Sequence, residues 1–149
     1  MLKMKKILLD TDIGSDIDDA VCLAYLLMQP EAKLLGITTV TGQVTLRAQM
    51  ADEVSARFTH PMLKPVLDFS EVWFQEQERL FFLDPLAAVC LFNPAVCTFT
   101  SGQVTVNSDA AAGELGKTDF TSNTQGPPHQ VALTINPEAF FEAFFSVFD

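Results

Sequence analysis

Short apolar runs separated by polar loops predict an α/β protein. The apolar run at residues 7–9 predicts a buried strand, and residues 20–28, apolar nearly all round, predict a buried helix. Residues 33–40 are rich in apolar and β-branched side chains and predict a second strand, with a second helix over residues 46–58. Strand, helix and strand with short connections form a βαβ unit, in which the two strands run parallel.

The pattern changes near residues 57–61 and then predicts three more helices and three strands. The helices are expected at residues 62–73, at 85–92 and after 136–137, and the strands at 97–100, 103–106 and 130–135. Residues 107–128 are polar and predict a loop or a long hairpin. We expect one domain over residues 1–149, an N-terminal βαβα part (1–57) followed by a C-terminal part (62–149), with a short parallel sheet and helices on both of its faces.

The composition and net charge of the chain limit the classes of molecule that it can bind. The 149 residues are 48% apolar, which is enough for a core, and the net charge of −10 argues against binding to nucleic acid or to an anionic membrane. No apolar stretch approaches the length of a membrane span. Three cysteines without a C-x-x-C pair predict reduced thiols in a cytoplasmic protein.

Five aspartates follow the first predicted strand within ten residues. They are Asp10, Asp12, Asp16, Asp18 and Asp19. Ligands bind at the carboxyl ends of strands in open α/β sheets, and carboxylates this close repel one another unless a cation neutralises them. A helix-capping role for Asp18 or Asp19 explains one or two of the five, not all. Oxygen ligands at a helix N-terminus suit Ca²⁺ or Mg²⁺, although the spacing is not that of an EF-hand.

One enzyme class matches the start of this loop. Asp10-Thr11-Asp12 after a strand resembles the D-x-D motif of haloacid-dehalogenase-type phosphatases, which implies Asp10 as nucleophile and Asp12 as acid/base. Gly14 stands where that motif expects threonine or valine. The motif also leaves the three later aspartates unexplained, so this hypothesis stays an alternative.

A longer pattern resembles the inosine-uridine-preferring nucleoside hydrolase family. DTDIGSDIDDA is similar to the family's N-terminal signature with two extra loop residues, and GITTVTG (36–42) to its second strand and following loop. Arg47-Ala48 is similar to the next helix. FFLDPLAAVCLFNPAVCTF (81–99) and VALTINPEAFFEAFFSVF (131–148) are similar to its C-terminal segments. About two-thirds of the chain carries the resemblance.

The resemblance implies hydrolysis of the N-glycosidic bond of nucleosides to ribose and free base, with one Ca²⁺ in the site. Asp12, Asp19 and Asp84 are the implied metal ligands, and Asp12 is also the implied base that takes a proton from water. Asp18 and Gln43 are implied ribose contacts, and Asp10 supports the loop. A carboxylate-rich pocket suits the positive charge that develops on the ribose in such a reaction.

Two departures from the family pattern favour a second hypothesis, a non-catalytic metal-binding remnant. Leu83 stands where many members have the histidine that protonates the leaving base. Members are also much longer, and the middle of the fold is expected to be missing near residues 57–61. A fold without its middle would leave part of the phenylalanine stripe at residues 140–148 uncovered, which favours self-association into a homo-oligomer.

Overall fold

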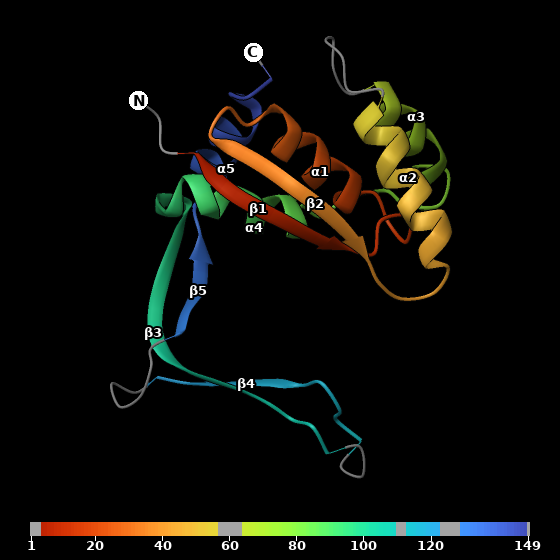
Figure 1. The fold of residues 1–149 in the computed structure, drawn as a ribbon. Helices are drawn as coiled ribbons and strands as arrows, with labels where there is room; N and C mark the ends of the chain where they lie inside the picture. The colour runs from red at the N-terminus through yellow and green to blue at the C-terminus, as the bar shows by residue number, and fades with distance from the viewer. Residues whose placement is uncertain (1–3, 57–63, 110–112, 123–128, 149) are drawn as a thin grey trace.

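Two parallel strands and one helix form the centre of the molecule. The computed structural model describes residues 4–56, 64–109, 113–122 and 129–148. Strand β1 (Lys5–Thr11) pairs in parallel with β2 (Ala32–Thr39), and helix α1 (Asp18–Met28) connects them (Figure 1). The predicted βαβ unit is therefore confirmed. The predicted junction at residues 57–61 lies outside the described residues.

The sheet formed by β1 and β2 has one packed face and one open face. Ile7, Leu9 and Thr11 of β1 alternate with more exposed residues, as expected for a half-buried strand. On the other face Leu8 is 68% exposed and Leu35 is 58% exposed. The α/β class with a parallel sheet is confirmed, but among the described residues no helix covers this second face, contrary to the prediction of helices on both faces.

Helix α1 is the core of the body because apolar residues surround it on nearly every side. Leu23 and Ala24 are completely buried, and Tyr25 is 1% exposed. Helices α2 (Val44–Ala56), α3 (Lys64–Trp73) and α4 (Leu83–Phe92) contact α1 and close the body, with α2 and α3 side by side at one end (Figure 1). No helix in the described parts of the chain has the length and hydropathy that a membrane span requires.

The C-terminal helix α5 (Pro137–Phe145) completes this core. Asn136 caps its start, because the side-chain oxygen accepts a hydrogen bond from the Ala139 amide at 3.2 Å. Phe140 and Phe144 are each 2% exposed, and Phe144 stacks on Tyr25 at 5.6 Å between ring centroids. Phe141 and Phe145 of the same stripe are 40% and 50% exposed. The predicted stripe is thus half buried.

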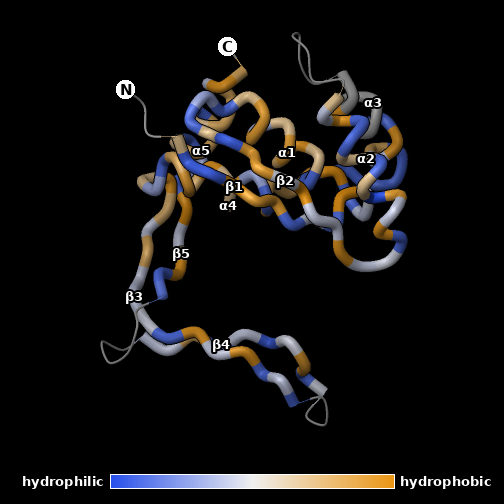
Figure 2. Tube along the Cα trace, viewed as in Figure 1, coloured by the Kyte–Doolittle hydropathy of each residue, from blue (hydrophilic) through white to orange (hydrophobic). Residues whose placement is uncertain are grey.

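Three antiparallel strands form an arm that projects from the body. A 3-10 turn (Pro94–Val96) leads into β3 (Cys97–Val106), which pairs with β5 (His129–Ile135) along its first half and with β4 (Thr118–Thr121) along its second half. The two short strands predicted at residues 97–106 are one long strand, and residues 107–128 contain β4 of a long hairpin. In Figure 2 apolar and polar positions are mixed along this arm, whereas the body concentrates apolar residues around α1.

Gly102 lies where β3 changes partner and the arm bends (Figure 1). A Cβ atom at this position would lie 2.5 Å from both the Phe120 ring and the Thr121 carbonyl oxygen. Any larger residue would therefore push β4 away from β3. The close approach of the β4 backbone to β3 therefore requires glycine at position 102.

Candidate metal and active site

The aspartate loop connects the carboxyl end of β1 to the first turn of α1. Gly14 in this loop has a φ of +101°, a conformation that side chains rarely adopt. A Cβ at Gly14 would also lie 2.7 Å from the Met50 sulfur on α2. The loop path thus depends on glycine both for its dihedral angles and for the close packing of α2.

Three carboxylates of this loop can share one cation. Oxygen atoms of Asp16, Asp18 and Asp19 lie within 4.8 Å of one another, with Asp18 and Asp19 buried and Asp16 exposed. The Asp18 amide donates a hydrogen bond to Asp16 Oδ1 at 3.2 Å, and the Thr11 hydroxyl donates to Asp19 Oδ1. In the described part of the chain no lysine or arginine forms a salt bridge with these three residues. A site with this donor set fits a divalent cation that prefers oxygen.

Asp84 reaches the same cluster from the far end of the chain. It stands in the first turn of α4, and its amide donates a hydrogen bond of 3.4 Å to Asp18 Oδ2. Burial, then the charges of Asp19 and Asp18, raise the pKa of Asp84 from its ordinary value of 3.8 to about 7. A hydrogen bond with Asp18, followed by burial, raises the pKa of Asp16 to about 6. Both shifts mark a site with excess negative charge.

The other residues implied by the family resemblance lie around this cluster rather than in it. The Asp12 side chain is 48% exposed, and its Oδ2 accepts a hydrogen bond from the Ser15 hydroxyl at 3.1 Å. Asp10 accepts one from the Thr38 hydroxyl at 2.5 Å. Gln43 is exposed, and its backbone oxygen accepts the Arg47 amide at the start of α2. The compact triad thus contains Asp16, to which the sequence analysis gave no role.

Arg47 joins the loops of the candidate site, although the sequence analysis gave it no role. From α2 its guanidinium donates hydrogen bonds to the Ile13 carbonyl at 2.9 Å, the Thr41 carbonyl at 2.9 Å and the Ser15 hydroxyl at 2.7 Å. It also lies 4.0 Å from Asp12 Oδ2. Arg47 therefore ties together the two loops that the sequence placed on one edge of the sheet. The only hint in the sequence was the position of this arginine, shortly after the second loop.

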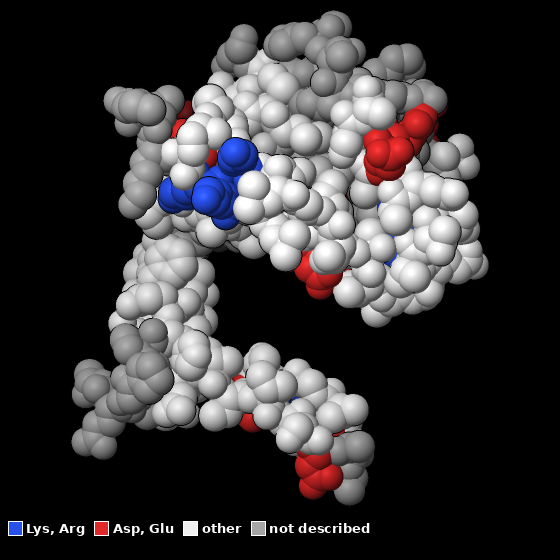
Figure 3. Space-filling model, viewed as in Figure 1, with Lys and Arg blue, Asp and Glu red and all other residues white. Residues whose placement is uncertain are grey.

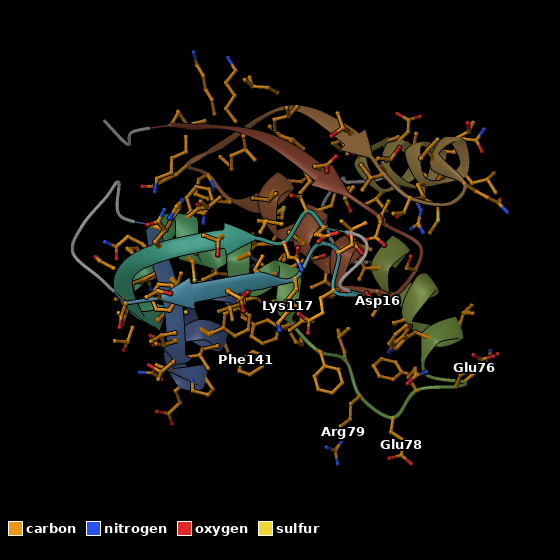
Figure 4. The ribbon with its side chains drawn as sticks, turned by 90° about the horizontal axis from the view of Figure 1, so that it is seen from below. Asp16, Glu76, Glu78, Arg79, Lys117 and Phe141 are labelled. Atoms are coloured by element: carbon orange, nitrogen blue, oxygen red, sulfur yellow. The ribbon has the colours of Figure 1, made fainter. Side chains whose placement is uncertain are left out.

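Two cavities border the acidic cluster. One of about 350 Å³ lies between β1 and α4, and its lining includes Asp10, Asp19 and Asp84. The other, of about 450 Å³, lies between the aspartate loop, α2 and α3, and its lining includes Asp16, Met50 and Trp73. Figure 4 shows Asp16 at the centre of the underside of the molecule, whereas Glu78 and Arg79 point into solvent beyond α3. Each cavity has room for a small polar molecule beside the carboxylates.

Comparisons with known proteins give one sequence match and one structural match. Residues 7–59 match the sequence model of the family described as inosine-uridine preferring nucleoside hydrolase. The structure is similar to that of a plant nucleoside hydrolase, with a TM-score of 0.63 and 12% sequence identity over 97% of this chain and 98% of the plant chain. A search of curated proteins gave no match.

The matched residues contain both loops that meet at the site, from β1 through α2. The structural likeness extends the common fold to α4 and the arm. These findings confirm the sequence resemblance over residues 7–59 and the nucleoside-hydrolase-like fold. Residues 7–59 are therefore similar in sequence to the inosine-uridine preferring nucleoside hydrolases, and the chain as a whole shares the fold of a solved nucleoside hydrolase.

Proposed function

We propose that this chain binds one Ca²⁺ ion in the acidic cluster and is a nucleoside N-ribohydrolase. The reaction splits the N-glycosidic bond of a purine or pyrimidine nucleoside into ribose and free base. The observation that carries the proposal is the arrival of Asp84 at Asp18 and Asp19, because two distant segments supply carboxylates to one small volume. The family match over the aspartate loop supports the same activity. We place the reaction in the cytoplasm, in keeping with three cysteines that form no disulfide.

Asp19 is the central ligand in this proposal. It belongs to the geometric triad with Asp16 and Asp18, and also to the set Asp12, Asp19 and Asp84 that the family resemblance implies. Carboxylates that raise one another's pKa bind a cation tightly, since the ion removes their repulsion. When bound, Ca²⁺ would hold the ribose hydroxyls and make a coordinated water more acidic.

The surrounding residues supply the rest of the chemistry. Asp12 is half-exposed and accepts a proton from the attacking water. Asp18 accepts a hydrogen bond from a ribose hydroxyl, and Gln43 contacts the ribose. Positive charge develops on the ribose as the bond to the base breaks, and the nearby carboxylates stabilise it. Arg47 keeps the Asp12 loop in place through its hydrogen bonds to Ile13 and Ser15.

A second candidate is binding of a cation and a nucleoside without turnover. Leu83 precedes Asp84 and is 69% exposed, so the position of the family's histidine carries no proton donor. A leaving base that receives no proton departs slowly. The phosphatase alternative has less support, because Asp10 lies outside the triad and the family match covers its loop.

Release of ribose from inosine and from uridine in the presence of Ca²⁺ tests the proposal. Activity that Asp12→Ala abolishes and Asp52→Ala retains would support it, since Asp52 is an exposed aspartate on α2 away from the acidic cluster. Equal activity in the parent protein and Asp12→Ala would rule out the role of Asp12. Binding of Ca²⁺ and inosine without ribose release would support the second candidate.

Calorimetric titration identifies the ion. We expect Ca²⁺ to bind more tightly than Mg²⁺, because Ca²⁺ accepts several carboxylates in irregular geometry, whereas Mg²⁺ requires near-ideal octahedral coordination. Separate Asp12→Asn and Asp16→Asn variants decide between the two ligand sets. The variant that loses affinity marks the side chain that coordinates the ion.

A further inference from the structure

We propose that two copies of this chain form a closed dimer by exchanging arms. The arm consists of β3, β4 and β5, and its acceptor is the groove along the free edge of β1 in the second copy. The acceptor groove borders the acidic cluster at one end, but this inference does not rest on the proposed function. Donor and acceptor lie on the same chain, so a two-fold axis satisfies both at once.

The acceptor is a strand edge without a partner. Within the described residues β1 pairs only with β2, which leaves the backbone donors and acceptors of its other edge without a strand. The cavity of about 350 Å³ between β1 and α4 follows this edge. Apolar side chains make up most of its lining, among them Leu9, Leu26 and Leu91, and Leu91 is 49% exposed. This arrangement suits an added strand.

The arm has the complementary properties of a donor. Because β3 pairs with β5 in one half and with β4 in the other, each half is a two-stranded ribbon with free edges, an arrangement that is marginally stable alone. Val106, Leu115 and Leu133 are 63%, 65% and 58% exposed. Figure 3 shows the arm separated from the body by a hollow that opens below the sheet.

The exposed area of the chain is large for its mass. Its accessible surface is 9953 Å². A compact monomer of 16.4 kDa would expose about 7,500 Å². The excess is about 2,450 Å² per chain. If two copies both bury it, the total of about 4,900 Å² falls in the range of obligate dimers, whose interfaces bury about 2,000–5,000 Å² in total.

Charge favours the same arrangement. Lys6 and Lys33 are directly opposite on β1 and β2, where like charges repel. The hairpin end of the arm carries the acidic residues Glu114 and Asp119. Lys117 forms an ion pair of 3.0 Å with Glu114. In the exchanged dimer the acidic end of one arm lies toward these lysines of the second copy, where the opposite charges attract.

Exchange of arms also completes the cavity beside the acidic cluster. The groove that receives the arm is lined at one end by Asp19 and Asp84. A partner arm seated along β1 therefore forms a wall that the single chain lacks among its described residues. The second copy would exclude bulk water from this side of the acidic cluster.

Sedimentation equilibrium of the purified chain tests the proposal. We expect a species of twice 16.4 kDa. Asp119→Lys and Lys33→Glu should each weaken the dimer by about tenfold, and the two substitutions together should restore it because the charges are exchanged. Glu78→Lys is the matched control, since this side chain points into solvent away from the hollow (Figure 4).

A monomer, an open series of larger assemblies, or a dimer that neither charge variant weakens would overturn the exchange. Both substituted residues are exposed, so the variants should keep the circular dichroism spectrum of the parent chain. Hydrogen exchange of the unsubstituted chain gives a second measurement. Amides of β1 that face the groove should exchange more slowly at high than at low protein concentration, and equal rates would also overturn the proposal.

Discussion

Arg47 Nη1 donates a hydrogen bond of 2.9 Å to the carbonyl oxygen of Ile13, across 34 positions of sequence. Ile13 is completely buried and begins the turn that brings the later aspartates to the helix. The same guanidinium reaches Thr41 in the second loop. One side chain on α2 thus fixes both loops at the carboxyl edge of the sheet, and the acidic cluster depends on it for its shape.

Replacement of Arg47 by alanine is expected to destabilise the protein by about 2 kcal/mol, since hydrogen bonds that involve a charged group are each worth about 1.5–3 kcal/mol and water replaces some of them. For a chain of this size the midpoint of thermal unfolding should fall by about 4–8 °C. Ca²⁺ affinity should fall as well, because the loop loses its anchor. Arg79→Ala is the control, because this side chain points into solvent, and it should change neither the midpoint of thermal unfolding nor the Ca²⁺ affinity. An unchanged unfolding midpoint in Arg47→Ala would contradict the anchoring role.

The stability of the metal-free protein should fall as the pH rises. The pKa values of Asp84 and Asp16 are about 7 and about 6 in the folded state and 3.8 ordinarily, so between pH 4 and 7 the folded state holds more protons than the unfolded state. The free energy of unfolding therefore decreases through this window and levels off above it. Chemical denaturation at a series of pH values measures this slope.

Saturating Ca²⁺ should change the same pH profile. The ion neutralises the carboxylates that are costly to ionise together, so it should raise the unfolding midpoint more at pH 8 than at pH 5. Asp84→Asn should flatten the slope of the metal-free protein. Equal stabilisation by Ca²⁺ at both pH values would argue that the ion binds elsewhere.

Asp84→Asn should also separate stability from metal binding. Loss of one negative charge from the cluster relieves repulsion with Asp19 and Asp18, so the metal-free variant should unfold at a higher temperature than the parent chain at pH 8. The same change should weaken Ca²⁺ binding by about tenfold or more, which corresponds to about 1.4 kcal/mol. Calorimetry and thermal denaturation give the two readouts; a variant that is both less stable and unchanged in affinity would contradict a site role.

Gly14→Ala should be more harmful than Gly116→Ala. Both glycines have a positive φ, +101° and +85°, so both substitutions carry backbone strain of about 1 kcal/mol. Only at Gly14 does the added methyl meet a close neighbour, the Met50 sulfur at 2.7 Å. We expect an additional loss of about 1–3 kcal/mol there by urea denaturation, because the tightly packed sulfur must move. Equal losses at the two positions would mean that Met50 moves freely.

Local patterns were sufficient for much of the fold. The apolar run at residues 7–9 and the β-branched run at residues 33–40 predicted two strands of a βαβ unit, and parallel pairing followed from the right-handed connection between them. The spacing of Phe140 and Phe144 predicted a helix face that is buried against Tyr25. These features depend on residues close in sequence, which is why periodicity reveals them.

The candidate site was predictable only in part. Five clustered aspartates indicated a cation site, and the resemblance at residues 81–99 added Asp84. Which carboxylates meet within 4.8 Å depends on the turn at Gly14 and on its fit against Met50, neither of which has a local signature. Asp16 therefore received no role from the sequence, and Asp12, which did, lies half-exposed beside Arg47.

By itself the sequence determined the elements, the acidic loop and the cation chemistry that the loop favours, because these follow from residue type and spacing along one strand–loop–helix segment. Tertiary structure alone decided that Asp84 is adjacent to Asp18, that Arg47 joins two loops, and that β1 has a free edge next to a projecting arm. Each of these relationships joins residues tens of positions apart. Packing of whole elements sets such distances, and no local pattern records it.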